Sequence, residues 1–118
     1  MDYCIVTTTC PHEEEAGRIS SILIESHLAA CIQISEITSM YEWKGEVNSE
    51  KEYLLTIKTT SDNYEKVESL ILRNHSYEIP EIIQIPIIRG SASYLQWIDE
   101  VITKRIVTQT KSCVFLIH

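Results

Sequence analysis

The sequence contains few of the residues that interrupt regular structure and few of the cations that bind polyanions. Three glycines and three prolines stand among 118 residues, so we expect regular elements joined by short turns. The sequence has ten basic and seventeen acidic residues, which gives a formal charge of −7, and no lysine- or arginine-rich segment occurs. Nucleic acids and anionic membranes bind clustered cations, so we expect neither as a partner.

Long apolar runs and paired cysteines are also lacking. No stretch approaches the roughly 20 apolar residues of a membrane-spanning helix, and no positively charged segment precedes the first apolar run. The cysteines show no CxxC spacing; they are Cys4, Cys10, Cys31 and Cys113. These features predict a cytoplasmic protein whose thiols are reduced and buried rather than bridged.

The signatures of common catalytic sites are absent as well. The sequence has no GxSxG, no P-loop and no GxGxxG segment, and its histidines form neither HxH nor HxxxH pairs. The carboxylates are numerous but scattered over predicted helix faces, where solvation is their usual role. We therefore expect a binding or regulatory protein and not an enzyme.

The apolar periodicity predicts one α+β domain over residues 1–105. The strands are expected at 3–9, 31–43, 47–60 and 82–88, and the helices at 11–28, 61–74 and 91–102. This β-α-β-β-α-β order is that of a ferredoxin-like sandwich, closed here by a C-terminal helix. Pro86 cannot donate to a strand ladder, so its strand should lie at a sheet edge or carry a bulge. Residues 106–118 are expected to form an edge strand or a disordered tail.

The second and third strands should form an unusually long hairpin around a turn at Lys44-Gly45. Its arms exceed the usual ~5–6 residues, so its far end needs a partner to pack on. Apolar residues change parity along the first arm, which predicts a bulge near Ser35-Glu36. Trp43, close to the tip, is hard to bury within one chain and is a candidate anchor in a neighbouring subunit.

Several segments, in order, resemble the CutA or divalent-cation tolerance family. They are LAACI at 28–32, YEWKGE at 41–46, the strand from Glu52 to Lys58-Thr59, HSYEIPE at 75–81 and YLQWI at 94–98. The similarity runs from about residue 3 to 103. It implies a ferredoxin-like homotrimer in which long hairpins pair around the threefold axis, with Tyr41 and Trp43 in the interface.

The resemblance also implies a cytoplasmic, regulatory role in divalent-metal tolerance, with copper as the metal bound by some members. His75 matches a ligand position of those members. Thr8 stands where they carry a cysteine, and Cys10 is the nearest substitute. Thiol and imidazole together suit copper or zinc. The predicted metal ligands are therefore His75 and Cys10.

Two other functions remain open for the same family architecture, which resembles that of PII signalling proteins. One is a small-molecule sensor with its ligand in an intersubunit cleft, lined by Cys31, Lys58, Tyr77, Glu81 and Trp97. The other is an enzyme that uses Lys58 and Glu81 of this cleft as acid–base partners.

Overall fold

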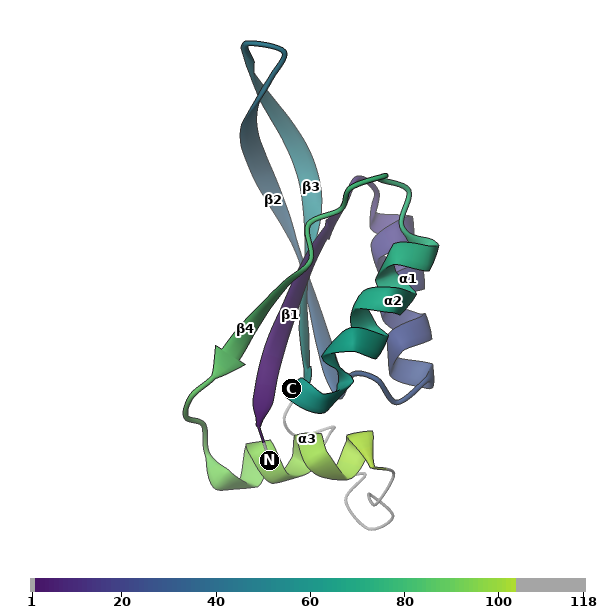
Figure 1. Ribbon diagram of the computed structural model, residues 1–118, viewed down its shortest axis with the longest axis vertical. Coiled ribbons are helices and arrows are strands. Elements are labelled where there is room, and N and C mark those ends of the chain that lie inside the picture. The colour runs from purple at the N-terminus through teal and green to yellow at the C-terminus, as the bar shows by residue number, and fades with distance from the viewer. Residues whose placement is uncertain (1, 104–118) are drawn as a thin grey trace.

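The computed structural model describes residues 2–103, which form one antiparallel sheet and the helices that cover it (Figure 1). The elements are β1 (Tyr3–Cys10), α1 (Glu13–Glu25), β2 (Cys31–Trp43), β3 (Glu46–Thr60), a 3-10 turn (Ser61–Asn63), α2 (Tyr64–Asn74), β4 (Ile83–Ile87) and α3 (Ala92–Ile102). The predicted α+β class and the β-α-β-β-α-β order with a final helix are confirmed. The predicted tail at 106–118 lies outside the described residues.

The strand order in the sheet is β2-β3-β1-β4, and every neighbouring pair is antiparallel. Strand β4 is therefore an edge strand. Its Pro86 lies opposite Cys4 of β1, and the lack of an N–H at Pro86 is tolerated because β4 has a single neighbour among the strands within residues 2–103. The predicted edge position of this strand is confirmed.

One face of the sheet is buried under α1 and α2, which lie side by side (Figure 1). Alternate residues of β1 point into this core, because side chains in a strand alternate between the two faces. Cys4, Val6 and Cys10 of β1 and Leu55 and Ile57 of β3 are fully buried there. The helices contribute residues at helical spacing to the same core: Ala16, Ile19, Leu23, Val67, Leu70 and Ile71.

Helix α1 is shorter than the predicted 11–28. It begins after His12, just beyond Pro11, and its first turn carries three acidic residues that favour the positive end of the helix dipole. It ends because His27 takes a left-handed conformation (φ 59°) and the N–H of Leu28 bonds back to the carbonyl of Leu23.

The β2–β3 hairpin extends well beyond the body of the domain (Figure 1). Its register is unbroken from Cys31 opposite Lys58 to Trp43 opposite Glu46, so the predicted bulge is wrong. That prediction assumed that one face of the whole arm is buried. No other described element covers the outer part, so apolar residues of both parities are accommodated without a bulge. The tip is a two-residue turn with positive φ at Lys44 and Gly45, as a type I′ turn requires.

Helix α3 packs across the end of the sheet that is remote from the hairpin tip (Figure 1). Its Trp97 and Ile98 form a second buried cluster with Ala30, the residue immediately before β2. Tyr3 and Cys31 pack against this cluster. The two ends of the sheet therefore differ, since one is closed by α3 and the other carries the overhanging hairpin.

Candidate functional site

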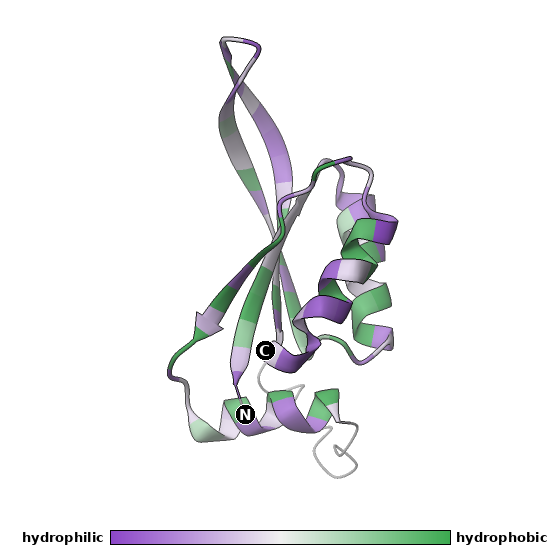
Figure 2. Ribbon diagram, in the orientation of Figure 1, coloured by the Kyte–Doolittle hydropathy of each residue, from purple (hydrophilic) through white to green (hydrophobic). Residues whose placement is uncertain are grey.

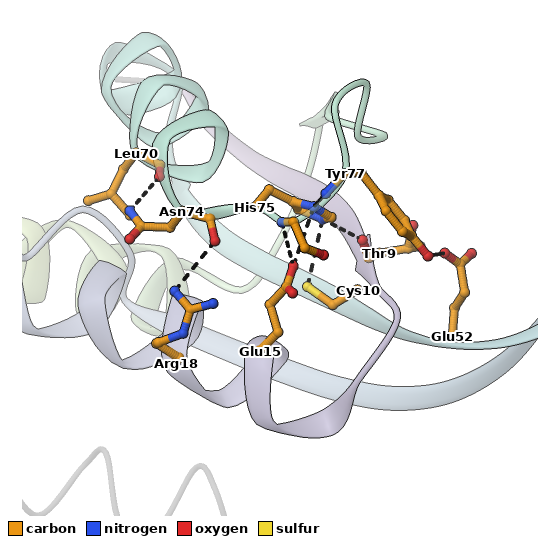
Figure 3. Close-up of polar contacts among 10 residues, drawn as sticks. Thr9, Cys10, Glu15, Arg18, Glu52, Leu70, Asn74, His75 and Tyr77 are labelled. Carbon is orange, nitrogen blue, oxygen red and sulfur yellow. Dashed lines mark hydrogen bonds and ion pairs between the residues drawn. The ribbon is translucent and has the colours of Figure 1, made fainter.

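Three potential metal-binding side chains meet at the end of β1 (Figure 3). Cys10 is the last residue of β1, Glu15 lies in the first turn of α1, and His75 follows α2 directly. One sulfur, one carboxylate oxygen and one ring nitrogen lie within 4.8 Å of one another. The structure thus brings together the two predicted ligands, Cys10 and His75, and adds Glu15.

The local chain ends explain this convergence. Helix α2 stops at Asn74, whose side-chain amide donates to the carbonyl of Leu70 at 2.8 Å, and His75 continues in extended conformation. Arg18 of α1 donates to the Asn74 carbonyl oxygen, with 3.4 Å between nitrogen and oxygen. Contacts to α1 therefore fix the end of α2, and the imidazole of His75 turns towards β1 (Figure 3).

Both ring nitrogens of His75 have hydrogen-bond partners. Nε2 lies 2.7 Å from the carbonyl oxygen of Thr9, and the backbone N–H of Tyr77 lies 3.0 Å from Nδ1. A carbonyl only accepts and an N–H only donates, so the neutral tautomer with its proton on Nε2 satisfies both. The Cys10 sulfur is 3.8 Å from Nε2, and a Glu15 carboxylate oxygen is 3.4 Å from Nδ1.

The cluster is shielded from solvent, and the pKa values of two of its members are shifted in opposite directions. The side chain of His75 is fully buried and that of Glu15 is 8% exposed. Burial, together with the carboxylates of Glu15 and Glu52, raises the pKa of the Cys10 thiol to about 11, although Arg18 opposes this. Burial also acts to raise the pKa of Glu15, but hydrogen bonds from Ser76 and the nearby His75 and Arg18 outweigh it and leave that pKa lowered.

The donor set fits a borderline or soft divalent ion. Thiolate and imidazole suit zinc and copper, whereas magnesium and calcium need oxygen ligands. Two such ligands of one tetrahedral ion lie roughly 3.5 Å apart, given bonds of about 2.3 Å to sulfur and 2.0 Å to nitrogen. The observed 3.8 Å between Cys10 Sγ and His75 Nε2 is close to that spacing.

Glu15 occupies a different place in this arrangement. Its carboxylate approaches Nδ1, the nitrogen on the far side of the ring from Cys10. Carboxylates commonly hold a metal-binding histidine in this way, by accepting the proton of its other nitrogen. Glu15 is therefore placed to orient His75, while Cys10 and Nε2 would hold the ion.

A groove adjoins the cluster on the side of the hairpin. Its walls include Tyr41, Glu50 and Glu52 of the hairpin and Tyr77, Ile79 and Glu81 of the segment before β4. The hydroxyl of Tyr77 donates to Glu52 at 2.8 Å, and Thr7 donates to Glu81 at 3.2 Å. Burial and the hydrogen bond to Glu52 raise the pKa of Tyr77.

Comparison with known proteins agrees with this architecture. The family model described as "CutA1 divalent ion tolerance protein" matches residues 4–101. This chain belongs to the CutA1 family. The CutA protein of Thermus thermophilus is 41% identical over 97 residues, which are 81% of this chain and 94% of that protein. Human protein CutA is 40% identical over 79% of this chain, and the match spans only 52% of the human protein.

Solved CutA structures share the fold. The CutA of Archaeoglobus fulgidus, described as a periplasmic divalent cation tolerance protein, superimposes with a TM-score of 0.82 at 38% identity; the match covers 85% of this chain and 98% of that one. The CutA1 of Oryza sativa gives a TM-score of 0.82 at 34% identity, covering 86% and 94%. The description of the Archaeoglobus protein names tolerance to divalent cations, and neither description names a catalytic activity.

The sensor hypothesis placed its ligand in an intersubunit cleft, and the described chain shows where the predicted lining residues lie. Cys31 lies opposite Lys58, whose ammonium is 5.5 Å from the ring centre of Tyr94, and Trp97 stacks on Tyr94. Tyr77 instead contacts Glu52, which is six positions from Lys58 along β3, or about 20 Å at ~3.3 Å per residue. Glu81 shares a groove with Tyr77 and accepts from Thr7, which lies opposite Thr56 of β3.

Three groups that contact His75, Cys10 or Tyr77 in this CutA protein were not predicted from its sequence. The Thr9 carbonyl has no sequence signal, because it belongs to the backbone. Glu15 was one of three consecutive glutamates that the helix dipole already explained. Glu52 lies only 9% exposed in β3, yet its partner Tyr77 is 25 positions away. Spacing along the chain could not reveal such contacts.

Proposed function

We propose that this chain is a homotrimeric, non-enzymatic CutA protein that binds copper or zinc through Cys10 and His75 and acts in regulating metal tolerance. The observation that carries the proposal is the 3.8 Å approach of the Cys10 sulfur to His75 Nε2, from positions 65 residues apart. The family description and the name of the Thermus thermophilus relative mention divalent ions, which supports the same class of ligand.

Exposed apolar residues on the hairpin support the trimer. Met40, Trp43 and Val47 are 70%, 62% and 75% exposed. Figure 2 shows hydrophobic stretches along the β2 arm, whereas the outer part of the β3 arm is largely hydrophilic. On the uncovered face of the sheet, Ile83 and Ile85 of β4 are also about half exposed. Large exposed apolar surfaces of this kind mark interfaces. A second and third copy of the chain are the partners that the CutA fold offers.

Two further predictions remain part of this proposal. No helix within residues 2–103 is long and apolar enough to cross a membrane. We retain the cytoplasmic location expected from the sequence, although relatives carry the words periplasmic and chloroplastic in their names. The hypothesis that Lys58 and Glu81 act as an acid–base pair in an enzyme loses support, because each contacts another residue: Lys58 lies beside Tyr94, and Glu81 accepts from Thr7.

Calorimetric titration of tag-free protein with zinc and with copper tests the metal site. The cysteines are reduced beforehand and the reductant is removed. We expect binding stoichiometric with the subunit, lost in His75→Ala and in Cys10→Ala. His12→Ala is the matched control, because His12 is exposed and its side chain makes no capping bond. Equal binding by His75→Ala and wild type would refute the site.

A small-molecule sensor is the second candidate, and one observation favours it. Among the described residues, the buried indole N–H of Trp97 has no hydrogen-bond partner, and it stands near the Lys58–Tyr94 pair. A ligand with an acceptor group would satisfy it. A thermal-shift screen of metals and metabolites separates the two candidates, since a ligand of the folded state raises the melting temperature. Shifts with metabolites alone, abolished in Lys58→Met, would favour the sensor.

A further inference from the structure

The metal-free arrangement of His75 uses both ring nitrogens, one on each side of the cluster. On one side, Nε2–H donates to the Thr9 carbonyl at 2.7 Å, next to Cys10. On the other side, Nδ1 accepts the backbone N–H of Tyr77 at 3.0 Å. The imidazole therefore connects the end of β1 with the segment that leads to β4.

A metal bound at Nε2 needs the lone pair of that nitrogen, so the ring proton must leave it. In a neutral imidazole the proton then resides on Nδ1. Glu15 is ready to accept it, because its carboxylate oxygen is 3.4 Å away. A protonated Nδ1 can no longer accept from Tyr77, so the N–H of Tyr77 loses its partner. A half-buried N–H without a partner is unfavourable, and the segment should move to hydrate it.

Other contacts hold this segment at both of its ends and in its middle. At the ends, the N–H of Ser76 donates to Glu15 at 3.0 Å and Ile82 packs against the core. The Tyr77 hydroxyl bonds to Glu52, Glu81 accepts from Thr7, and Ile79 between them is 89% exposed. Tyr77 thus makes two hydrogen bonds, from its N–H to His75 and from its hydroxyl to Glu52 of the hairpin strand β3 (Figure 3), and its ring centre also lies 5.0 Å from that of His75. When the Tyr77 N–H loses its bond to His75, the backbone of Tyr77 moves, and its hydroxyl is then displaced relative to Glu52.

We propose that occupation of the Cys10–His75 site releases Tyr77 from Glu52 and so opens the groove between the segment at 76–82 and the β2–β3 hairpin. This inference rests on the proposed metal-binding function and adds its regulation. Metal binding and the Tyr77–Glu52 hydrogen bond are then mutually opposed. Such coupling is reciprocal: whatever weakens the hydrogen bond must tighten metal binding by the same factor.

The test is the zinc affinity of Tyr77→Phe, which removes the hydroxyl and leaves every charge in place. A hydrogen bond of this kind contributes about three- to tenfold to an equilibrium constant, so the variant should bind zinc about three- to tenfold more tightly. Tyr64→Phe is the matched control, because it removes a comparable bond, Tyr64 to Glu68 at 3.0 Å within α2. Its zinc affinity should equal that of the wild type.

Amide hydrogen exchange provides a second readout on the wild-type protein. Exchange at the N–H of Tyr77 should accelerate on zinc saturation, whereas exchange at Ile57 in the core of β3 should not. Equal zinc affinity of Tyr77→Phe and wild type, or slower exchange at Tyr77 with zinc, overturns the coupling and leaves the metal site intact. Failure of the wild type to bind zinc through His75 overturns the proposed function itself.

Discussion

His75 Nε2 donates a hydrogen bond of 2.7 Å to the carbonyl oxygen of Thr9, 66 positions earlier in the chain. In the metal-free protein this bond ties the end of β1 to the segment after α2. It also satisfies a backbone carbonyl at the point where β1 ends. His75 therefore has a structural role as well as the proposed role as a ligand.

Replacement of His75 by alanine should destabilise the metal-free protein by about 2–4 kcal/mol, because the Thr9 carbonyl and the Tyr77 N–H lose their partners and a buried ring is removed. Urea unfolding with a chelator present measures this loss. His12→Ala, at an exposed position, should stay within about 0.5 kcal/mol of the wild type. Matching midpoints for His75→Ala and wild type would contradict the structural role.

Stability should fall at alkaline pH because of Cys10. Its pKa is raised from 9.0 to about 11 in the folded state. Below pH 9 the thiol is protonated in both states and the full contribution is present. Above pH 9 the unfolded chain releases its proton first, so stability declines until the pH passes about 11. Two pKa units correspond to about 2–3 kcal/mol at most.

Unfolding free energies of Cys10→Ala, measured from pH 8 to 11, should therefore decline less steeply than those of the wild type. Cys31→Ala should keep the steep decline, since Cys10 is untouched in it. Parallel curves for Cys10→Ala and wild type would show that the thiol does not couple folding to pH.

His27→Gly should stabilise the protein by about 0.5–1 kcal/mol. His27 has φ 59°, a left-handed conformation that costs a residue with a Cβ about 1–2 kcal/mol, partly offset by the greater entropy of unfolded glycine. Thermal unfolding reports the gain. Ser26→Gly, where φ is −84° and the hydroxyl bonds to the Ile22 carbonyl, should lower the melting temperature instead. A decrease for His27→Gly would contradict the strain argument.

Trp43→Ala should weaken assembly and leave the fold of the subunit unchanged. The ring is 62% exposed in one chain, and a buried interface aromatic typically contributes about 2 kcal/mol or more. Sedimentation over a dilution series should show the variant dissociating at concentrations where the wild type remains trimeric. Leu72→Ala, at a 52% exposed position on α2, should assemble normally. An undiminished trimer for Trp43→Ala would remove its role as an anchor.

The sequence was informative where local chemistry decides the structure. Helical and strand periodicity located every described element, and Pro86 indicated an edge strand. Tyr41 and Trp43 lie exposed on the hairpin, as an interface role requires, although assembly itself stays a prediction. Spacing could not show which residues meet across the fold. Glu15 contacts the segment after α2 from 61 positions away, and nothing in the sequence distinguishes it from its neighbouring glutamates.

The unbroken register of the hairpin limits which insertions and deletions in its two arms related sequences can tolerate. Each residue of β2 faces one of β3, from Cys31 with Lys58 to Trp43 with Glu46. Deleting one residue from a single arm would turn all later side chains of that arm to the opposite face. Only matched deletions preserve the pattern, such as Thr38 and Ser39 together with Glu50 and Lys51. Natural variation in hairpin length should therefore occur in blocks of four residues, two from each arm.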